Sequence, residues 1–83
     1  MKIVFKQSAL KDLEKLTDLV SKRILNKLTF FISQKDVLKY TKPMVNKDFG
    51  SYRFRIGDYR VIFDLEKDKI IILVIGHRKD IYK

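Results

Sequence analysis

The sequence contains no cysteine, one histidine, one proline and three glycines among its 83 residues. Without cysteine the chain forms no disulfide and no thiolate metal site, which suits a reducing compartment. A single histidine also excludes a histidine-rich metal centre, and we expect neither a metal site nor a cofactor. The scarcity of glycine and proline leaves no linker of low complexity, so we expect a single domain over residues 1–83.

Long apolar runs are also absent. The longest one extends from Ile70 to Ile75, whereas a membrane-spanning helix needs roughly 20 apolar residues. The first residues lack the extended apolar segment of a signal peptide. We therefore expect a soluble protein of the cytoplasm.

Positive charge is what the chain has in excess. Nineteen Lys and Arg against ten Asp and Glu give a net charge of +9. The positive electrostatic field of such a charge raises the concentration of polyanions near the surface. It points to nucleic acid or a ribonucleoprotein as the partner. An acidic protein would be attracted by the same field.

The first half of the sequence has the spacing of a short strand followed by two helices. Ile3 to Phe5 forms the apolar strand, Ser8 is the expected N-cap of the first helix, and Thr17 or Asp18 that of the second. Apolar residues then recur at helical spacing and are expected to form the core: Leu10, Leu13, Leu16, Val20, Ile24, Leu28 and Phe31. These stripes indicate a helical hairpin that covers a sheet.

The helical spacing of apolar residues ends between Asp36 and Gly50, where we expect an irregular connection with at most one extra helical turn. Residues 51–56 then alternate between polar and apolar, as a half-buried strand does. Gly57-Asp58 fits a two-residue hairpin loop in which glycine supplies the positive φ of a type II′ turn. The next strand covers residues 59–65.

A second turn at Lys67-Asp68 leads into the last strand. Ile70 to Ile75 is apolar at every position, which is expected of an interior strand covered on both faces. The register of this hairpin sets Phe63 opposite Ile72 and Arg60 opposite Ile75. A register shifted by one residue and a bulge at Gly76, which would redirect His77 and Arg78, stay open as alternatives.

The first hairpin sets Arg55 directly opposite Arg60 on one face of the sheet. Like charges across a strand pair destabilise it by about 0.2–1 kcal/mol, so a sequence that keeps them is expected to bind an anion there. A phosphate suits the fork of a guanidinium group. The second hairpin brings residues 76–78 to the same end, so that four of the five arginines gather in one region.

Each of these features also has a purely structural interpretation. The arginine stripe is then a solvated strand face, and His77 a surface or hydrogen-bonded histidine. Tyr82 would pack its ring on the edge of the sheet. We expect the Arg60 side chain to point away from the core, so that replacing it costs no stability.

Two segments together carry a specific resemblance. The string Tyr52-Arg-Phe-Arg-Ile-Gly-Asp-Tyr-Arg-Val-Ile62, followed by Gly76-His-Arg-Lys-Asp-Ile-Tyr82, resembles the RelE/ParE toxin superfamily. The resemblance implies an α+β, RelE-like fold with two N-terminal helices packed on a curved, mainly antiparallel sheet of about four strands. It also implies a RelB-like antitoxin that covers the active surface in a toxin–antitoxin hetero-oligomer.

The resemblance implies roles for particular residues of this sequence. Arg60 and Arg78 match the active-site arginines of RelE-like members, and Tyr82 matches their C-terminal tyrosine. Ser51 stands where some members have a lysine, a role that Lys47 could fill. The expected RNA-binding residues share a basic side chain near these motifs: Lys47, Arg53, Arg55 and Lys79.

RelE-like members cut mRNA in the ribosomal decoding site, and this is the activity that the resemblance implies. Metal-independent cleavage needs the ribose 2′-hydroxyl deprotonated, the phosphate charge stabilised and the leaving oxygen protonated. Arg60 and Arg78 are expected to stabilise charge, because arginine does not readily release its proton. Tyr82 is the candidate for proton transfer, with His77 as its competitor.

Two other functions stay open. ParE-like members share the fold and inhibit DNA gyrase without cutting RNA. A simple RNA-binding module is disfavoured because the aromatic residues of the sheet alternate toward the core rather than forming an exposed stacking platform.

Overall fold

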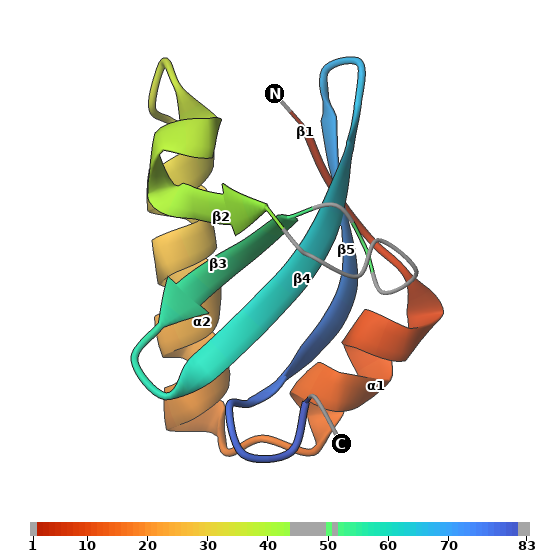
Figure 1. The fold of residues 1–83 in the computed structure, drawn as a ribbon. Helices are drawn as coiled ribbons and strands as arrows, with labels where there is room; N and C mark the ends of the chain where they lie inside the picture. Colours follow the sequence, from red (N-terminus) through yellow and green to blue (C-terminus); the bar gives the residue numbers. More distant parts are fainter. Residues whose placement is uncertain (1, 44–49, 51, 82–83) are drawn as a thin grey trace.

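The computed structural model describes residues 2–43, 50 and 52–81, and Figure 1 shows their arrangement. Two helices precede most of a five-stranded sheet whose order is β1-β5-β4-β3-β2. Strand β1 runs parallel to β5, and the other neighbours are antiparallel. In chain order the elements are β1 (Lys2–Phe5), α1 (Gln7–Glu14), α2 (Asp18–Ile32), the 3₁₀ helix η1 (Val37–Tyr40), β2 (Thr41–Pro43), β3 (Tyr52–Ile56), β4 (Tyr59–Glu66) and β5 (Lys69–His77).

The α+β architecture is confirmed, with five strands where about four were expected. The additional strand is β2, which falls in the segment expected to be irregular, directly after the single helical turn η1. A three-residue strand that ends in Pro43 has too little sequence to show a periodicity. Proline is tolerated there because β2 is an edge strand.

Helix α2 packs against one face of the sheet, and its apolar stripe is confirmed as core. Ile24, Leu28 and Phe31 are buried on it. The ring of Phe31 stacks on Phe54 with 4.7 Å between centroids, and Phe54 stacks on Phe63 at 4.5 Å. The Thr17 hydroxyl accepts a hydrogen bond from the Val20 amide and so caps the helix as expected.

Helix α1 differs from its prediction at both its start and its buried face. The N-cap is Lys6, and the Ser8 hydroxyl instead donates to the carbonyl oxygen of Leu73 on β5. Leu10, expected in the core, is 40% exposed, and Ala9 is the fully buried residue of this helix. The Asp12 carboxylate accepts from the Ile75 amide.

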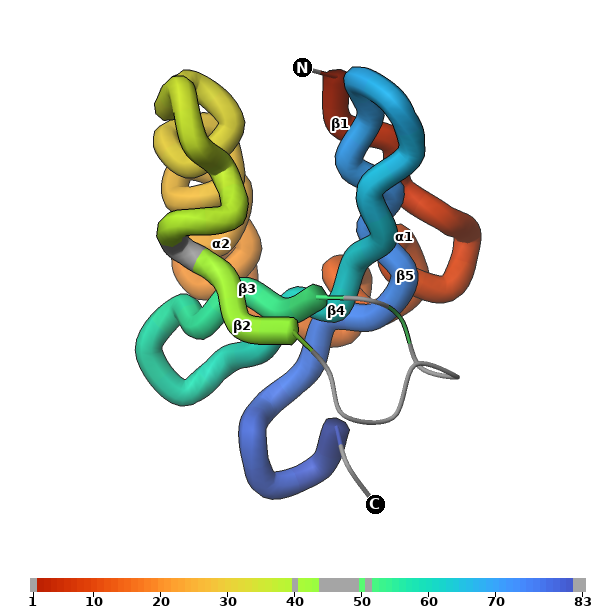
Figure 2. The backbone as a smooth tube through the Cα atoms, turned by 45° about the horizontal axis from the view of Figure 1, so that its top comes forward, coloured from red at the N-terminus to blue at the C-terminus, as the bar shows by residue number. Residues whose placement is uncertain are grey.

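The hydrogen bonds of Ser8 and Asp12 satisfy backbone groups of β5. Strand β1 pairs with β5 only as far as Phe5 opposite Ile72, so the next residues of β5 would present unpaired backbone groups at a sheet edge. Side chains of α1 bind them instead. In Figure 2 α1 lies beside β5, while α2 lies at the other end of the sheet.

Both tight turns occur where they were expected. Gly57 has a φ of 59°, and Asp58 is not among the residues of positive φ, as a type II′ turn requires. Lys67 opens the second turn with a φ of 57°, a left-handed conformation that costs a residue with a side chain some strain.

The register of the first hairpin is confirmed, and that of the second is correct only in part. Phe63 lies opposite Ile72 as expected, but the ladder is irregular between Ile62 and Phe63, so that Arg60 lies opposite Gly76 rather than Ile75. Leu73 is the extra residue on β5, and such a bulge bends the strand.

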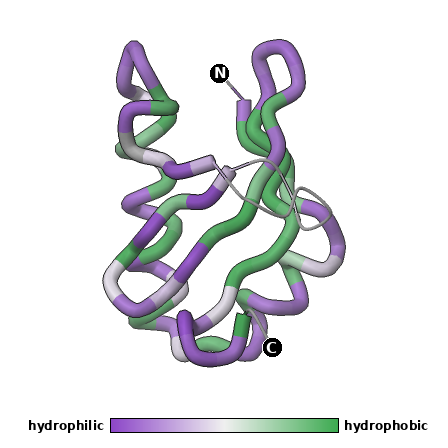
Figure 3. Tube along the Cα trace, viewed as in Figure 1, coloured by the Kyte–Doolittle hydropathy of each residue, from purple (hydrophilic) through white to green (hydrophobic). Residues whose placement is uncertain are grey.

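Strand β5 is an interior strand, flanked by β1 and β4. Its coverage on both faces is less complete than expected. Ile70, Ile72 and Ile75 are buried, whereas the intervening apolar residues are half-buried. In Figure 3 hydrophobic residues (green) follow the central parts of β4 and β5, and hydrophilic residues (purple) occur at the turns that join the strands. No helix within the described ranges is long and apolar enough to cross a membrane.

Candidate functional site

Strand alternation gives the sheet two chemically different faces. Tyr52, Phe54 and Ile56 of β3 belong to the hydrophobic core on the α2 side. Arg53 and Arg55 alternate with them and therefore lie on the opposite face. Residues directly paired across strands share a face, which adds Lys42, opposite Arg53, and Arg60, opposite Arg55. We call the face formed by Lys42, Arg53, Arg55 and Arg60 the cationic face.

The cationic face contains two like-charge pairs on neighbouring ladders. Arg55 faces Arg60 between β3 and β4, and Lys42 faces Arg53 between β2 and β3. Lys42 and Arg55 are exposed, and neither forms an ion pair with any residue that the structure describes. Cationic side chains gathered on one face attract anions, and guanidinium forks match phosphate oxygens, so this face is suited to bind polyanions.

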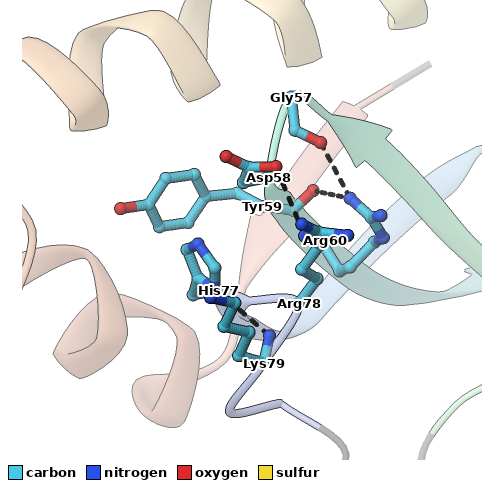
Figure 4. A network of polar contacts seen from close by, with 7 residues as sticks. All are labelled: Gly57, Asp58, Tyr59, Arg60, His77, Arg78 and Lys79. Carbon is cyan, nitrogen blue, oxygen red and sulfur yellow. Dashed lines mark hydrogen bonds and ion pairs between the residues drawn. The ribbon is translucent and has the colours of Figure 1, made fainter.

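Arg60 lies deeper in the structure than the sequence indicated. Arg60 is only 8% exposed to solvent. One guanidinium nitrogen, Nη1, donates to the carbonyl oxygens of Gly57 and Tyr59, each at 2.9 Å, as Figure 4 shows. The expectation that this side chain points away from the core and contributes nothing to stability is therefore wrong, because it bends back onto its own turn.

Arg78 is held beside the same turn by Asp58. Its Nε lies 3.3 Å from Asp58 Oδ1, and its amide donates to the Asp58 carbonyl oxygen at 2.7 Å. Both side chains are more than half exposed. Arg60 on β4 and Arg78 in the turn after β5 thus both contact residues 57–59. The expected approach of residues 76–78 to the first hairpin is confirmed.

His77 occupies the other side of the sheet from Arg60. It pairs with Tyr59 on β4, and its ring meets the Tyr59 ring edge-on, with 5.4 Å between centroids and 82° between planes. Tyr59 packs against the hydrophobic core. In Figure 4 the two rings point away from the Arg60 guanidinium. Strand alternation thus separates His77 from the cationic face.

The Nδ1 atom of His77 accepts a hydrogen bond from the Lys79 amide at 3.1 Å. This bond shapes the tight turn after β5. The Lys79 side chain is exposed, near the turn but beyond the end of the ladder. Tyr82 and Lys47, the other expected site residues, and Ser51 lie outside the described residues.

A pocket opens at the β2 edge of the cationic face. It encloses about 240 Å³ and is lined by Lys39, Thr41, Lys42, Arg53 and Arg55. Lys39 and Lys42 were not identified from the sequence as site residues. The signal that could have found them is the pairing of Lys42 with Arg53, which becomes visible only once β2 is known to be a strand. In the described ranges no group of three or more His, Cys, Asp or Glu side chains is arranged to hold a metal ion.

Comparisons with known proteins show which family the chain is similar to. The model of the family described as "ParE toxin of type II toxin-antitoxin system, parDE" matches residues 3–82. The chain is 33% identical to Toxin RelE3 of Methanocaldococcus jannaschii over 99% of this chain and 96% of that protein. It is 30% identical to Toxin RelG of Mycobacterium tuberculosis over 95% and 92%.

A solved structure shows the same fold. The crystal structure of the toxin–antitoxin complex RelBE2 from Mycobacterium tuberculosis contains a chain that superposes with a TM-score of 0.76 and 24% identity, covering 93% of this chain and 96% of that one. With the family match over nearly the whole length, the fold and the sequence motifs lead to one conclusion. The chain belongs to the RelE/ParE superfamily of type II toxins and is RelE-like.

Proposed function

We propose that the protein is an endoribonuclease that cuts mRNA in the ribosomal A site without a metal cofactor and thereby inhibits translation. The observation that carries this proposal is the convergence of Arg60 and Arg78 on the turn at residues 57–59, on the same sheet as the exposed cationic residues Lys42 and Arg55. Preorganised guanidinium groups stabilise the charge that develops on a phosphate when the ribose 2′-hydroxyl attacks it.

The geometry suggests a division of labour among the arginines. Arg60 is fixed by two main-chain carbonyls and would hold the scissile phosphate in one position. Arg78 is more exposed and would stabilise charge on the leaving 5′-oxygen. Arg53 and Arg55, farther along the cationic face, would bind neighbouring phosphates of the strand.

Proton transfer is assigned to Tyr82 rather than His77. The His77 ring packs on Tyr59 toward the core, so it lies across the sheet from the phosphate proposed for Arg60. A free tyrosine has a pKa of about 10 and is a weak base at neutral pH. Dependence on the ribosome follows, since the ribosome would supply the alignment and desolvation that the toxin lacks.

The proposal includes the partners. The toxin would act on translating ribosomes in the cytoplasm, and a RelB-like antitoxin would silence it in a hetero-oligomer. The chain of similar fold from Mycobacterium tuberculosis was solved as a toxin–antitoxin complex, which supports an antitoxin partner here.

The test is primer extension on mRNA from a translation reaction, with and without the protein. A parallel cleavage step uses preformed ribosome complexes in which an inert polyamine replaces magnesium. Discrete cuts within codons that depend on the ribosome and persist after exchange of magnesium for an inert polyamine support the proposal. An intact message at protein concentrations that arrest translation contradicts it.

One observation favours a second candidate. The family model that matches residues 3–82 is described as that of the ParE toxin, and ParE-like members inhibit DNA gyrase. A supercoiling assay with purified gyrase distinguishes the two: inhibition of gyrase together with uncut message would replace the nuclease proposal.

A further inference from the structure

The pocket at the β2 edge of the cationic face has no role in the chemistry proposed for Arg60 and Arg78. Its cationic lining comes from three consecutive elements: Lys39 on η1, Lys42 on β2, and Arg53 and Arg55 on β3. Among the residues that the structure describes, no acidic side chain contributes to this lining. The described part of the lining therefore offers an anion cationic groups and the Thr41 hydroxyl.

The pocket is continuous with the proposed reaction centre through Arg55. This residue lines the pocket and is also the direct cross-strand partner of Arg60. Neighbouring strands lie about 4.8 Å apart, and Arg53 and Arg55, the partners of Lys42 and Arg60, are two residues or about 7 Å apart along β3. The Lys42 backbone therefore lies roughly 12 Å from that of Arg60 on β4. A ligand that reaches from Arg60 into the pocket must therefore be an extended chain that carries more than one negative charge.

The lysines of the pocket are positioned to make contact with such a ligand. Lys39 and Lys42 are exposed, and neither forms a hydrogen bond or ion pair through its side chain with another described residue. Lys42 lies directly opposite Arg53 on the ladder, so cationic side chains from two neighbouring strands can approach the same phosphate. A sugar–phosphate backbone supplies such charges at regular intervals along a flexible strand.

We propose that this pocket is a second phosphate-binding subsite, which holds a backbone phosphate of single-stranded RNA at a distance from the scissile phosphate. The identity of that strand as mRNA rests on the proposed function. Lys39 and Lys42 bind the phosphate, and Arg53 and Arg55 bind it from the neighbouring strand. The subsite fixes the path of the strand across β4, β3 and β2, and so determines which phosphate meets Arg60.

The test measures binding of a short single-stranded RNA oligonucleotide by fluorescence anisotropy across a range of salt concentrations. The variant is Lys39→Ala/Lys42→Ala, in which both lysines of the pocket are removed. For single strands the slope of log K against log salt changes by about 0.7 for each phosphate that the protein neutralises. We expect the double variant, which leaves one phosphate without its lysines, to lower the slope by that amount and to bind roughly tenfold more weakly at low salt.

The matched control is Lys11→Ala/Lys22→Ala. These two lysines are exposed on α1 and α2, and their removal lowers the net charge equally without touching the pocket. Lys39→Arg/Lys42→Arg keeps the charge in place and should restore the wild-type slope. Thermal melting of each variant checks that the fold is intact, which is expected because all four side chains are exposed.

Two results would overturn the subsite. In the first, the pocket variant and the control lose affinity and slope equally, so that only the overall field matters. In the second, the pocket variant binds RNA as the wild type does but loses binding to a polyglutamate peptide, which would make the pocket a site for acidic protein. Neither result depends on cleavage, so a wild-type protein that binds RNA here but cuts no message would contradict the proposed function alone.

Discussion

Replacement of Arg60 by alanine should damage stability and cleavage together. The Arg60 side chain is nearly buried and donates to two main-chain carbonyl oxygens of its own hairpin. Hydrogen bonds from a charged donor contribute about 1.5–3 kcal/mol each. The carbonyl of Gly57 belongs to an exposed residue and regains water in the variant, so the loss is smaller than the full sum. Relief of repulsion with Arg55 returns about 0.2–1 kcal/mol.

These terms leave a net loss of about 1–3 kcal/mol in the free energy of unfolding. For a domain of this size each kcal/mol shifts the melting temperature by about 4–8 °C. We therefore expect Arg60→Ala to melt roughly 5–20 °C below the wild type while remaining folded at 25 °C. Calorimetry or thermal circular dichroism measures the shift.

Cleavage should fall further than the stability loss explains. Removal of one preorganised charged group that stabilises a transition state costs about 10²–10³ in rate, and we expect a loss of this size in single-turnover assays at 25 °C. Arg60→Lys should recover little, because an ammonium group does not reproduce the geometry of a guanidinium fork.

Arg55→Ala is the matched control for Arg60→Ala. Arg55 lies opposite Arg60 on the same face but is exposed. Its removal relieves the same repulsion without breaking the bonds of the turn, so the melting temperature should hold or rise. If Arg60→Ala has the same melting temperature as the wild type, the hydrogen bonds to Gly57 and Tyr59 do not stabilise the hairpin. If it cuts at the wild-type rate, the proposed active site is wrong.

Substitutions at the two turns and at the C-terminal motif give three more predictions. Lys67→Gly should raise the urea midpoint by the equivalent of about 0.5–1 kcal/mol, because Lys67 adopts a φ of 57° that glycine accepts without strain; an unchanged or lower midpoint contradicts this. Asp58→Asn should reduce cleavage roughly tenfold through misplacement of Arg78 while lowering stability by less than about 1 kcal/mol, since the ion pair is exposed; equal activity would show that Arg78 needs no anchor. Tyr82→Phe should slow single-turnover cleavage by about 10²–10⁴ and His77→Ala by far less, and the reverse order would assign proton transfer to His77.

The sequence predicts the first hairpin in detail because its turn and strand pattern agree. Gly57 accepts the positive φ that the two-residue loop requires, and residues 52–56 alternate with a period of two. A shift of one residue would move Phe54 out of the core. The opposition of Arg55 and Arg60 follows from this register alone.

The second hairpin lacks that constraint on one of its strands. Residues 70–75 are apolar throughout, so a shift of one residue exchanges one apolar side chain for another at nearly every position. The hydrophobic pattern therefore gives no sign of the extra residue at Leu73. This is why the sequence predicted Ile75 opposite Arg60 where the structure has Gly76.

Strand β2 and the lysines near it could not be predicted for a different reason. The strand exists through its pairing with β3 over three residues, Thr41 to Pro43, and this pairing is not encoded by any local periodicity. In the sequence Lys39 and Lys42 therefore look like isolated surface charges. They acquire a role only when the fold brings them beside Arg53 and Arg55.

The two central arginines differ in how the chain fixes them. Arg60 is held by the carbonyl oxygens of Gly57 and Tyr59, which every residue type supplies, so its position depends on the geometry of the turn. Arg78 depends on the carboxylate of one residue, Asp58. Changes that disturb the turn should therefore affect both arginines, whereas a change of the Asp58 side chain alone should release Arg78 and leave Arg60 in place. The Gly57-Asp58 turn thus positions the two arginines in two separable ways, Arg60 through its backbone and the Arg78 side chain through the Asp58 carboxylate. In the proposed mechanism the first would serve phosphate binding and the second the leaving group.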